Sequence, residues 1–273
     1  MQAHSLWTPP AGVLGAIVTE AEQRAEAIAR RASQLEDVVS ARAPAPSLEG
    51  ALRGASVALL TEVKRQSPSK GAIAQGLDAV VQANAYAAGG AAGLSILTEP
   101  RHFGGSIEDL RDVVRQVRLP VLKKDFHVHP AQLLEARAEG ASAALLIVRA
   151  ITPDRLAELM SYGRAIGIEL LVEVRDEAEL ELALKLGATM IGVNNRNLET
   201  LVIDLATAER LIPLIPSNVI AIAESGISSL ADVERYAAVG ADAVLVGSSL
   251  SAAADPVAAT RALAGVPRVN RAR

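Results

Sequence analysis

Eight short, nearly continuous apolar runs divide the chain from residue 57 onward. They are VALLTEV (57–63), GLSILTE (93–99), PVLKKDF (120–126), AALLIV (143–148), IELLVEV (168–174), TMIGV (189–193), NVIAIAE (218–224) and DAVLVG (242–247). Runs of this kind are typical of parallel strands that are buried on both faces. Each run therefore predicts one strand of a parallel sheet.

The segments between these runs have the spacing of amphipathic helices. PAQLLEARAEG (130–140) and TPDRLAELMSYGRAIG (152–167) each end in a glycine, the residue expected just past a helix end. Gly-Ala pairs at 90–91, 140–141, 187–188 and 240–241 close a predicted helix before every second strand. Eight strands that alternate with helices predict a (β/α)8 TIM barrel, whose usual length is ~250 residues. An open doubly wound sheet is the alternative, but no GxGxxG follows the first strand.

A separate helical pattern precedes the first strand. Apolar residues from Leu14 to Val39 recur three and four positions apart, which predicts one amphipathic helix. Pro44 and Pro46 end this pattern and mark a linker. We therefore expect an N-terminal helical extension and linker over residues 1–50, followed by a single catalytic barrel domain over residues 51–273.

Composition excludes several classes of protein. A formal net charge of -4 without clustered basic residues argues against nucleic acid binding, and the absence of cysteine excludes disulfides and thiolate metal sites. The first residues, MQAHSLWTPP, do not read as a secretory signal, and no apolar run reaches the ~18 residues of a membrane helix. We expect a soluble cytoplasmic protein. Aromatic residues make up only 2% of the chain, which draws attention to its two phenylalanines.

Polar side chains follow five of the predicted strands at their carboxyl ends. A single such residue is often a solvated charge beside a strand, but barrel active sites are built at this face of the fold. Charges gathered in a barrel mouth must also pair with one another. The pattern thus predicts an active site formed by Glu62, Lys64, Lys124, Glu173, Asn194, Arg196 and Glu224.

The loops after the last two strands have the composition of a phosphate site. ESGIS (224–228) and VGSSL (246–250) each lead into a helix. Glycine lets a phosphate approach the backbone, and serine hydroxyls and helix N–H groups can then donate hydrogen bonds to it. Ordinary strand-to-helix turns have a similar composition, so both interpretations stay open. The candidates are Ser225, Gly226, Gly247 and Ser248, with Ser67 in the first loop.

His127 and His129, in the stretch FHVHP, are the residues that could suggest a metal site. No third ligand stands near them in the sequence, and two ligands do not make a zinc site. We therefore predict no metal ligands.

The chain resembles the indole-3-glycerol-phosphate synthases from about Gly50 to Leu263, and more loosely in the N-terminal helix. The resemblance rests mainly on EVKRQSPSKG (62–71), LKKDF (122–126), IGVNNRNLETL (191–201), IAESGI (222–227) and VLVGSSL (244–250). Lys123, where the family often has arginine, and the stretch FHVHP depart from the family pattern. Neither departure touches an expected catalytic residue.

The resemblance implies ring closure, decarboxylation and dehydration of 1-(2-carboxyphenylamino)-1-deoxyribulose 5-phosphate to indole-3-glycerol phosphate, in tryptophan biosynthesis. No cofactor is implied. Lys124 would be the general acid and Glu173 its partner in proton removal, while Glu62, Lys64, Asn194 and Glu224 would orient groups and stabilise charge. Substrate would be bound by Ser67, Phe126, Leu145, Arg196, Leu198, Ser225, Gly226, Leu245, Gly247 and Ser248. We expect a phosphorylated small-molecule substrate and a monomer or weak homodimer.

Other functions share part of this pattern. Phosphoribosylanthranilate isomerase and the tryptophan synthase α chain have similar phosphate loops but would not need Lys64, Lys124 and Glu173 together. A catalytically silent phosphosugar-binding barrel is the alternative from a different class. It would be expected to lack one of the charged strand ends, and this chain has all of them.

Overall fold

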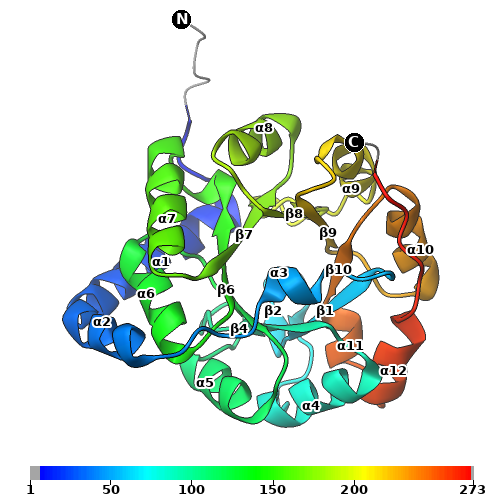
Figure 1. Cartoon of the computed structure of the whole chain (residues 1–273), viewed down its shortest axis with the longest axis horizontal. Helices are drawn as coiled ribbons and strands as arrows, with labels where there is room; N and C mark the ends of the chain where they lie inside the picture. The colour runs from blue at the N-terminus through cyan, green and yellow to red at the C-terminus, as the bar shows by residue number, and fades with distance from the viewer. Residues whose placement is uncertain (1–6, 272–273) are drawn as a thin grey trace, which may run out of the picture.

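Eight parallel strands close into a barrel in the computed structural model, which describes residues 7–271. Around the barrel the order is β1-β10-β9-β8-β7-β6-β5-β4, and β4 pairs with β1 to complete the ring (Figure 1). Each strand begins within two residues of its predicted run, so the prediction of a (β/α)8 barrel is confirmed. The strands are β1 (Ala58–Val63), β4 (Gly93–Leu97), β5 (Val121–Lys124), β6 (Ala143–Ile147), β7 (Glu169–Val174), β8 (Met190–Asn194), β9 (Ile220–Glu224) and β10 (Ala243–Val246).

Helices surround the strands and connect one to the next (Figure 1). Gly90, Gly140, Gly187 and Gly240 have φ angles of 99°, 90°, 78° and 89°. These left-handed values explain why glycine recurs just past the helix ends, because a side chain would be strained there. The helices are α4 (Ala79–Gly89), α5 (Ile107–Gln116), α6 (Pro130–Glu139), α7 (Pro153–Ala165), α8 (Glu177–Lys185), α9 (Ala206–Leu211), α10 (Leu230–Ala238), α11 (Ser248–Ser251) and α12 (Pro256–Leu263). Two 3₁₀ turns, η1 (Val148–Ala150) and η2 (Ile212–Leu214), and a small hairpin, β2 (Gln66–Ser67) with β3 (Gly71–Ala72), complete these connections.

The N-terminal extension forms two long helices, so the prediction of one continuous helix was wrong. α1 (Gly12–Ala29) and α2 (Ala32–Ala41) are separated by a break at Arg30 and Arg31. The break has a tertiary cause. α1 buries Leu14 and Ile17 in the main core, whereas α2 packs its Leu35 against Leu134 and Ala138 of α6. The break therefore lies between the helix that packs mainly on the main core and the helix that packs on α6.

A third helix, α3 (Leu48–Ala51), covers the end of the barrel where the strands begin. Glu169, at the start of β7, accepts hydrogen bonds from the backbone N–H groups of Leu48 and Glu49 at 2.8 and 2.9 Å. Leu48 is fully buried, and a Cβ on Gly93 at the start of β4 would lie 2.7 Å from its Cδ1. Leu48 therefore plugs the base of the barrel, which leaves the opposite end for the cavity. Within residues 7–271, no helix combines the length and apolar composition needed to cross a membrane.

Candidate active site

The carboxyl ends of the strands surround a cavity of about 260 Å³. The cavity brings together all the residues that the sequence predicts for the site. Its lining includes Glu62, Lys64, Ser67, Lys124, Phe126, Leu145, Glu173, Asn194, Arg196, Leu198, Glu224, Ser225, Gly226, Leu245, Gly247 and Ser248. All the candidate residues therefore lie together around one cavity.

Lys124 lies at the centre of the charged group in this cavity. It ends β5, and its Nζ donates to Glu224 Oε2 at 2.8 Å and to Glu173 Oε2 at 3.1 Å. Asn194, at the end of β8, donates its side-chain N–H to Glu173 Oε1 at 2.8 Å. Because all these residues sit on strands, their positions are fixed by the barrel and not by loops.

Burial and the neighbouring carboxylates shift the pKa of Lys124 in opposite directions. Burial lowers the pKa of Lys124, but the carboxylates of Glu224 and Glu173 outweigh burial and hold the pKa well above its ordinary value. Burial raises the pKa of Glu224 to about 7, with the nearby Glu173 charge adding to burial and Lys124 opposing it. Within residues 7–271, Glu224 Oε1 is buried without a hydrogen-bond partner.

Glu62 and Lys64 form a second charged pair beside the first. Lys64 Nζ makes an ion pair with Glu62 Oε1, and Ser95 donates its hydroxyl to Glu62 Oε2 at 3.3 Å. The backbone N–H of Lys64 donates to Ser251 Oγ at 3.1 Å, and that serine donates in turn to the Glu62 carbonyl. The end of β1 is thereby held in place, with its lysine directed at the cavity.

Asn194 and Arg196 have internal partners that sequence analysis did not foresee. Asn194 Oδ1 accepts the backbone N–H of Arg196 at 2.9 Å, which fixes the amide that holds Glu173. Arg196 Nη1 donates to the carbonyl of Leu201, a residue with a φ angle of 65°. The loop after β8 is thus folded over the cavity by its own hydrogen bonds.

Glycine and serine gather on one side of the cavity, after β9 and β10. Ser225 and Gly226 have φ angles of 67° and 82°, so this turn exposes backbone in a conformation that side chains disfavour. A Cβ on Gly247 would lie 2.6 Å from Glu62 Oε1 and 3.3 Å from Lys64 Nζ. Gly247 therefore makes room for the Glu62–Lys64 pair, a reason for glycine beyond backbone access to phosphate.

The two histidines of FHVHP have structural partners. His127 donates from Nδ1 to the Leu145 carbonyl at 2.8 Å, and burial lowers its pKa to about 3, so the ring is neutral. His129 caps α6, because its Nδ1 accepts the backbone N–H of Ala131 at 3.1 Å. These rings are engaged in packing and capping.

Several residues of the site were missed. Val13, Leu14 and Ile17 of α1 line the cavity, as does Phe103 in the loop after β4. A helical pattern shows which face is apolar but not where that face lies, so sequence could not place α1. Gly192 was missed as well. A Cβ at this position in β8 would overlap Glu224 Oε1, so the glycine creates space for that carboxylate inside the barrel.

Comparisons with known proteins agree on one family. Residues 14–263 match the sequence model described as indole-3-glycerol phosphate synthase. The chain is 48% identical over 237 residues to an indole-3-glycerol phosphate synthase of Mycolicibacterium vanbaalenii, covering 85% of this chain and 87% of the relative. It is 50% identical over 221 residues to that of Streptomyces griseus, covering 81% and 82% respectively.

Solved structures with lower identity share the fold. The 3-hexulose-6-phosphate synthase from Salmonella typhimurium is 19% identical, with a TM-score of 0.57 over 76% of this chain and 96% of its own. The thiamine phosphate pyrophosphorylase from Pyrococcus furiosus is 17% identical, with the same TM-score over 80% of this chain and 96% of its own. At such identities only the barrel architecture is comparable. Family-model coverage and the close relatives together decide the assignment: the chain belongs to the indole-3-glycerol phosphate synthase family.

Proposed function

We propose that the protein converts 1-(2-carboxyphenylamino)-1-deoxyribulose 5-phosphate to indole-3-glycerol phosphate, carbon dioxide and water. The observation that carries the proposal is the Lys124 ammonium held between Glu173 and Glu224 in the cavity. Ring closure onto a carbonyl requires a proton donor at the oxygen, and dehydration requires both an acid and a base. The close relatives bear the name of this activity.

Lys124 is the proton donor in this proposal. The two carboxylates keep its ammonium charged, and it protonates the substrate carbonyl oxygen as the aromatic ring carbon attacks the carbonyl carbon. Glu173, fixed by Asn194, then accepts the proton that the substrate loses beside its nitrogen during dehydration. Glu224 orients Lys124 and the polar groups of the substrate.

The balance of the reaction requires one proton from solvent. The substrate carboxylate leaves as neutral carbon dioxide, and its bonding electrons restore the aromatic ring. The former carbonyl oxygen leaves as water with two hydrogens, one of which the substrate itself supplies. The other comes from the protein, so Lys124 or its neighbours must be reprotonated in each cycle.

Binding of the substrate is divided among three parts of the cavity. Lys64, held by Glu62, faces the substrate carboxylate, and Arg196 binds nearby or supports its loop. The ribulose phosphate lies at the glycine and serine turns, with hydrogen bonds from backbone N–H and hydroxyl groups. The aromatic ring packs against Phe126, Leu145, Leu198 and Leu245, and the phosphate against Ser67, Ser225, Gly226, Gly247 and Ser248.

The test is to incubate the purified protein with this substrate and follow the indole fluorescence of the product. We expect turnover in the presence of EDTA, because the substrate carries its own reactive groups and the residues of the cavity supply the acid and base. A parallel incubation with phosphoribosylanthranilate tests the isomerase alternative. Turnover of that compound alone, or activity that EDTA abolishes and a divalent ion restores, would contradict the proposal.

We place this reaction in the cytoplasm and expect the protein to act as a monomer or weak homodimer. The proposed catalytic groups all line one cavity of a single chain, which supports activity without a second copy. Light scattering across a range of concentrations, with activity measured in parallel, tests the point. Activity per chain that disappears on dilution would show that the active form is an oligomer.

A further inference from the structure

Both phenylalanines of the chain line the same cavity. Phe103 lies in the loop after β4 and Phe126 just past the end of β5. Their ring centroids are 6.1 Å apart with an interplanar angle of 35°, the spacing of an interacting aromatic pair. In a chain with so few aromatic residues, this pair forms a distinct aromatic wall, and its position depends on two loops.

Each phenylalanine is held by a buried carboxylate through its backbone. The N–H of Phe103 donates to Glu99 Oε2 at 3.0 Å, and that of Phe126 donates to Asp125 Oδ1 at 2.8 Å. Asp125 also accepts the hydroxyl of Thr98 at 2.6 Å. Glu99 is 0% exposed and Asp125 6% exposed. Two buried acids so close together need a cation, since an uncompensated buried charge is costly.

Arg24 of helix α1 supplies that cation. Its Nη2 donates to Asp125 Oδ1 at 2.8 Å, and its Nη1 lies 3.6 Å from Glu99 Oε1. A planar guanidinium can engage both carboxylates at once with two different nitrogens, which the single ammonium of a lysine cannot do in the same way. Arg24 thus connects the N-terminal helix to both loops that carry the phenylalanines.

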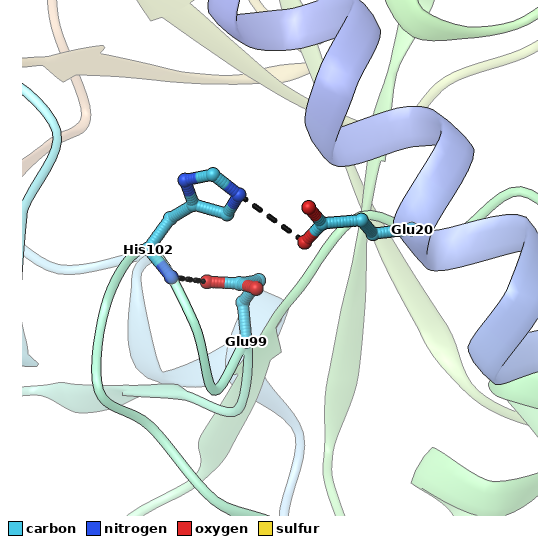
Figure 2. A group of neighbouring side chains, drawn as sticks. All are labelled: Glu20, Glu99 and His102. Carbon is cyan, nitrogen blue, oxygen red and sulfur yellow. Dashed lines mark hydrogen bonds and ion pairs between the residues drawn. The ribbon is translucent and has the colours of Figure 1, made fainter.

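A second contact lies one helical turn before Arg24. Glu20 pairs with Arg101 Nη1. It also pairs with His102 Nε2 at 3.2 Å (Figure 2). Figure 2 also shows the backbone N–H of His102 donating to Glu99, at 2.6 Å. Residues three and four apart share a helix face, so Glu20 and Arg24 both contact the loop after β4.

Glu20, Glu99 and His102 also place their ligand atoms within 4.8 Å of one another, as a metal site would. Their partners argue for another role. Glu99 accepts three backbone N–H groups, from residues 101, 102 and 103, and also faces Arg24. His102 Nε2 is directed at Glu20. A metal ion would have to break these contacts, so the cluster is an attachment of α1 to the loop after β4.

Helix α1 also contributes directly to the cavity. Val13, Leu14 and Ile17 line it, and Ile17 lies two turns before Arg24 on the same side of the helix. The apolar face of α1 and the aromatic wall therefore enclose the same space. If the helix shifts, Arg24 must leave its carboxylates, and the backbone N–H groups of both phenylalanines lose a fixed acceptor.

We propose that Arg24 is a positioning residue for the aromatic end of the substrate, because it couples the docking of α1 to the placement of Phe103 and Phe126. Arg24 does not line the cavity and takes no part in the chemistry. This inference rests on the proposed function only in naming the ligand, a ring of the anthranilate type. The phosphate end of the cavity, after β9 and β10, is outside its reach.

The test compares Arg24→Met, Arg24→Lys and Glu99→Gln with wild type and with Arg30→Met, which changes an exposed arginine just past the end of α1. Steady-state kinetics separates KM from kcat, and competitive inhibition by inorganic phosphate reports the phosphate end. Losing a hydrogen bond to a charged group costs ~1.5–3 kcal/mol, which corresponds to roughly 10- to 100-fold in affinity. We expect Arg24→Met to raise KM by about that factor, with kcat and the inhibition constant of phosphate near their wild-type values.

Arg24→Lys should recover part of the loss, because it keeps the charge but not the two-nitrogen contact. Glu99→Gln should also raise KM, and it provides the test if Arg24→Met does not fold. An unchanged KM in folded Arg24→Met would overturn the inference. Phosphate inhibition weakened by the same factor as KM is raised would also overturn it, because it would indicate that the whole cavity has loosened.

A ligand that requires no turnover separates this inference from the proposed function. Titration with a fluorescent N-alkyl anthranilate measures binding at the aromatic wall, with or without synthase activity. Weaker binding to Arg24→Met than to Arg30→Met supports the coupling even if wild type makes no indole-3-glycerol phosphate. Equal binding to the two variants contradicts it.

Discussion

Lys124 is held by two carboxylates at 2.8 and 3.1 Å, an arrangement that fixes both its charge and its direction. Replacing it with methionine removes the proton donor and leaves the ring and phosphate contacts in place. General acid–base groups contribute about 10²- to 10⁴-fold to rate. We expect Lys124→Met to lose kcat in that range with much less change in KM, and Glu173→Gln to act mainly on kcat as well.

The matched control for this comparison is Lys185→Met, at an exposed position near the end of α8. Steady-state kinetics of all the variants, with circular dichroism to verify folding, decides the matter. A folded Lys124→Met protein with near-normal kcat would remove this lysine from the mechanism.

Glu224 provides a prediction about pH and stability. Burial raises its pKa from 4.5 to about 7, so the folded protein keeps a proton that the unfolded chain releases between these values. Stability should therefore fall as the pH rises through this window. Glu224→Gln carries no ionisable group and so avoids the cost of a buried negative charge. Its Tm should therefore equal that of wild type at pH 5 and exceed it at pH 8. Each kcal/mol relieved corresponds to about 2–4 °C.

Calorimetry or thermal circular dichroism at the two pH values measures the difference. If Glu224→Gln is less stable than wild type at pH 8, the ion pair with Lys124 outweighs burial, and the assigned direction is wrong.

Gly192 leads to a steric prediction. An added Cβ would overlap Glu224 Oε1, and the strand that carries it is buried. Glu224 and its partner Lys124 would have to move, and misplacement of a catalytic group by about 1 Å can cost about 10²-fold in rate. We expect such a loss in Gly192→Ala, measured as kcat. Gly76→Ala, where an added Cβ meets no atom within 4 Å, should leave kcat unchanged.

At the scale of elements, α1 is attached at its first turn as well as near Arg24. Glu199, in the loop after β8, accepts the backbone N–H of Ala11 at 2.7 Å and pairs with Arg149 at 2.9 Å. A negative charge is favourable at a helix N-terminus, and α1 has no side-chain cap of its own. Glu199 therefore acts as the cap of α1, supplied from the barrel.

This attachment can be followed with Trp7, the single tryptophan of the chain. It lies just before α1, so its fluorescence reports on the start of the helix. We expect Glu199→Ala to make Trp7 more accessible to acrylamide quenching and to raise KM, while Glu181→Ala, at an exposed position on α8, does neither. Unchanged quenching in Glu199→Ala would show that α1 begins independently of the loop.

The strands and their charged ends could be predicted because both are local patterns. Each apolar run marks a strand, and the first polar residue after it, such as Glu173 or Glu224, falls at the mouth by the geometry of the barrel. The break at Arg30 could not be predicted, because it follows from where α1 and α2 pack. Phe103 was missed for the same reason, since only the fold brings its loop over the cavity. The same limit applies to Gly192, whose role depends on a side chain from the neighbouring strand.

At the scale of the whole molecule, the two ends of the barrel have separate tasks. The mouth carries the charged residues, and the base is plugged by Leu48 of α3, which is fully buried. Replacing a buried leucine with alanine costs ~2–5 kcal/mol. Leu48→Ala should therefore lower the free energy of unfolding by about this amount and leave KM and kcat unchanged at temperatures where the protein is folded.

Denaturant unfolding monitored by circular dichroism, together with kinetics at 25 °C, tests this separation. A folded Leu48→Ala protein with altered KM would mean that the base and the mouth are coupled through the barrel.

The partners of the N-terminal helices also determine the order in which the protein can be assembled. Arg24 reaches Asp125 across 101 residues, Ser47 reaches Glu169 across 122, and Ala11 reaches Glu199 across 188. On the ribosome, the first fifty residues are made before any of these acceptors exists. Contacts so distant in sequence form late and slowly. The apolar face of α1 therefore remains without its native partners until those later residues are made, so the segment that completes the cavity is synthesised well before it can dock.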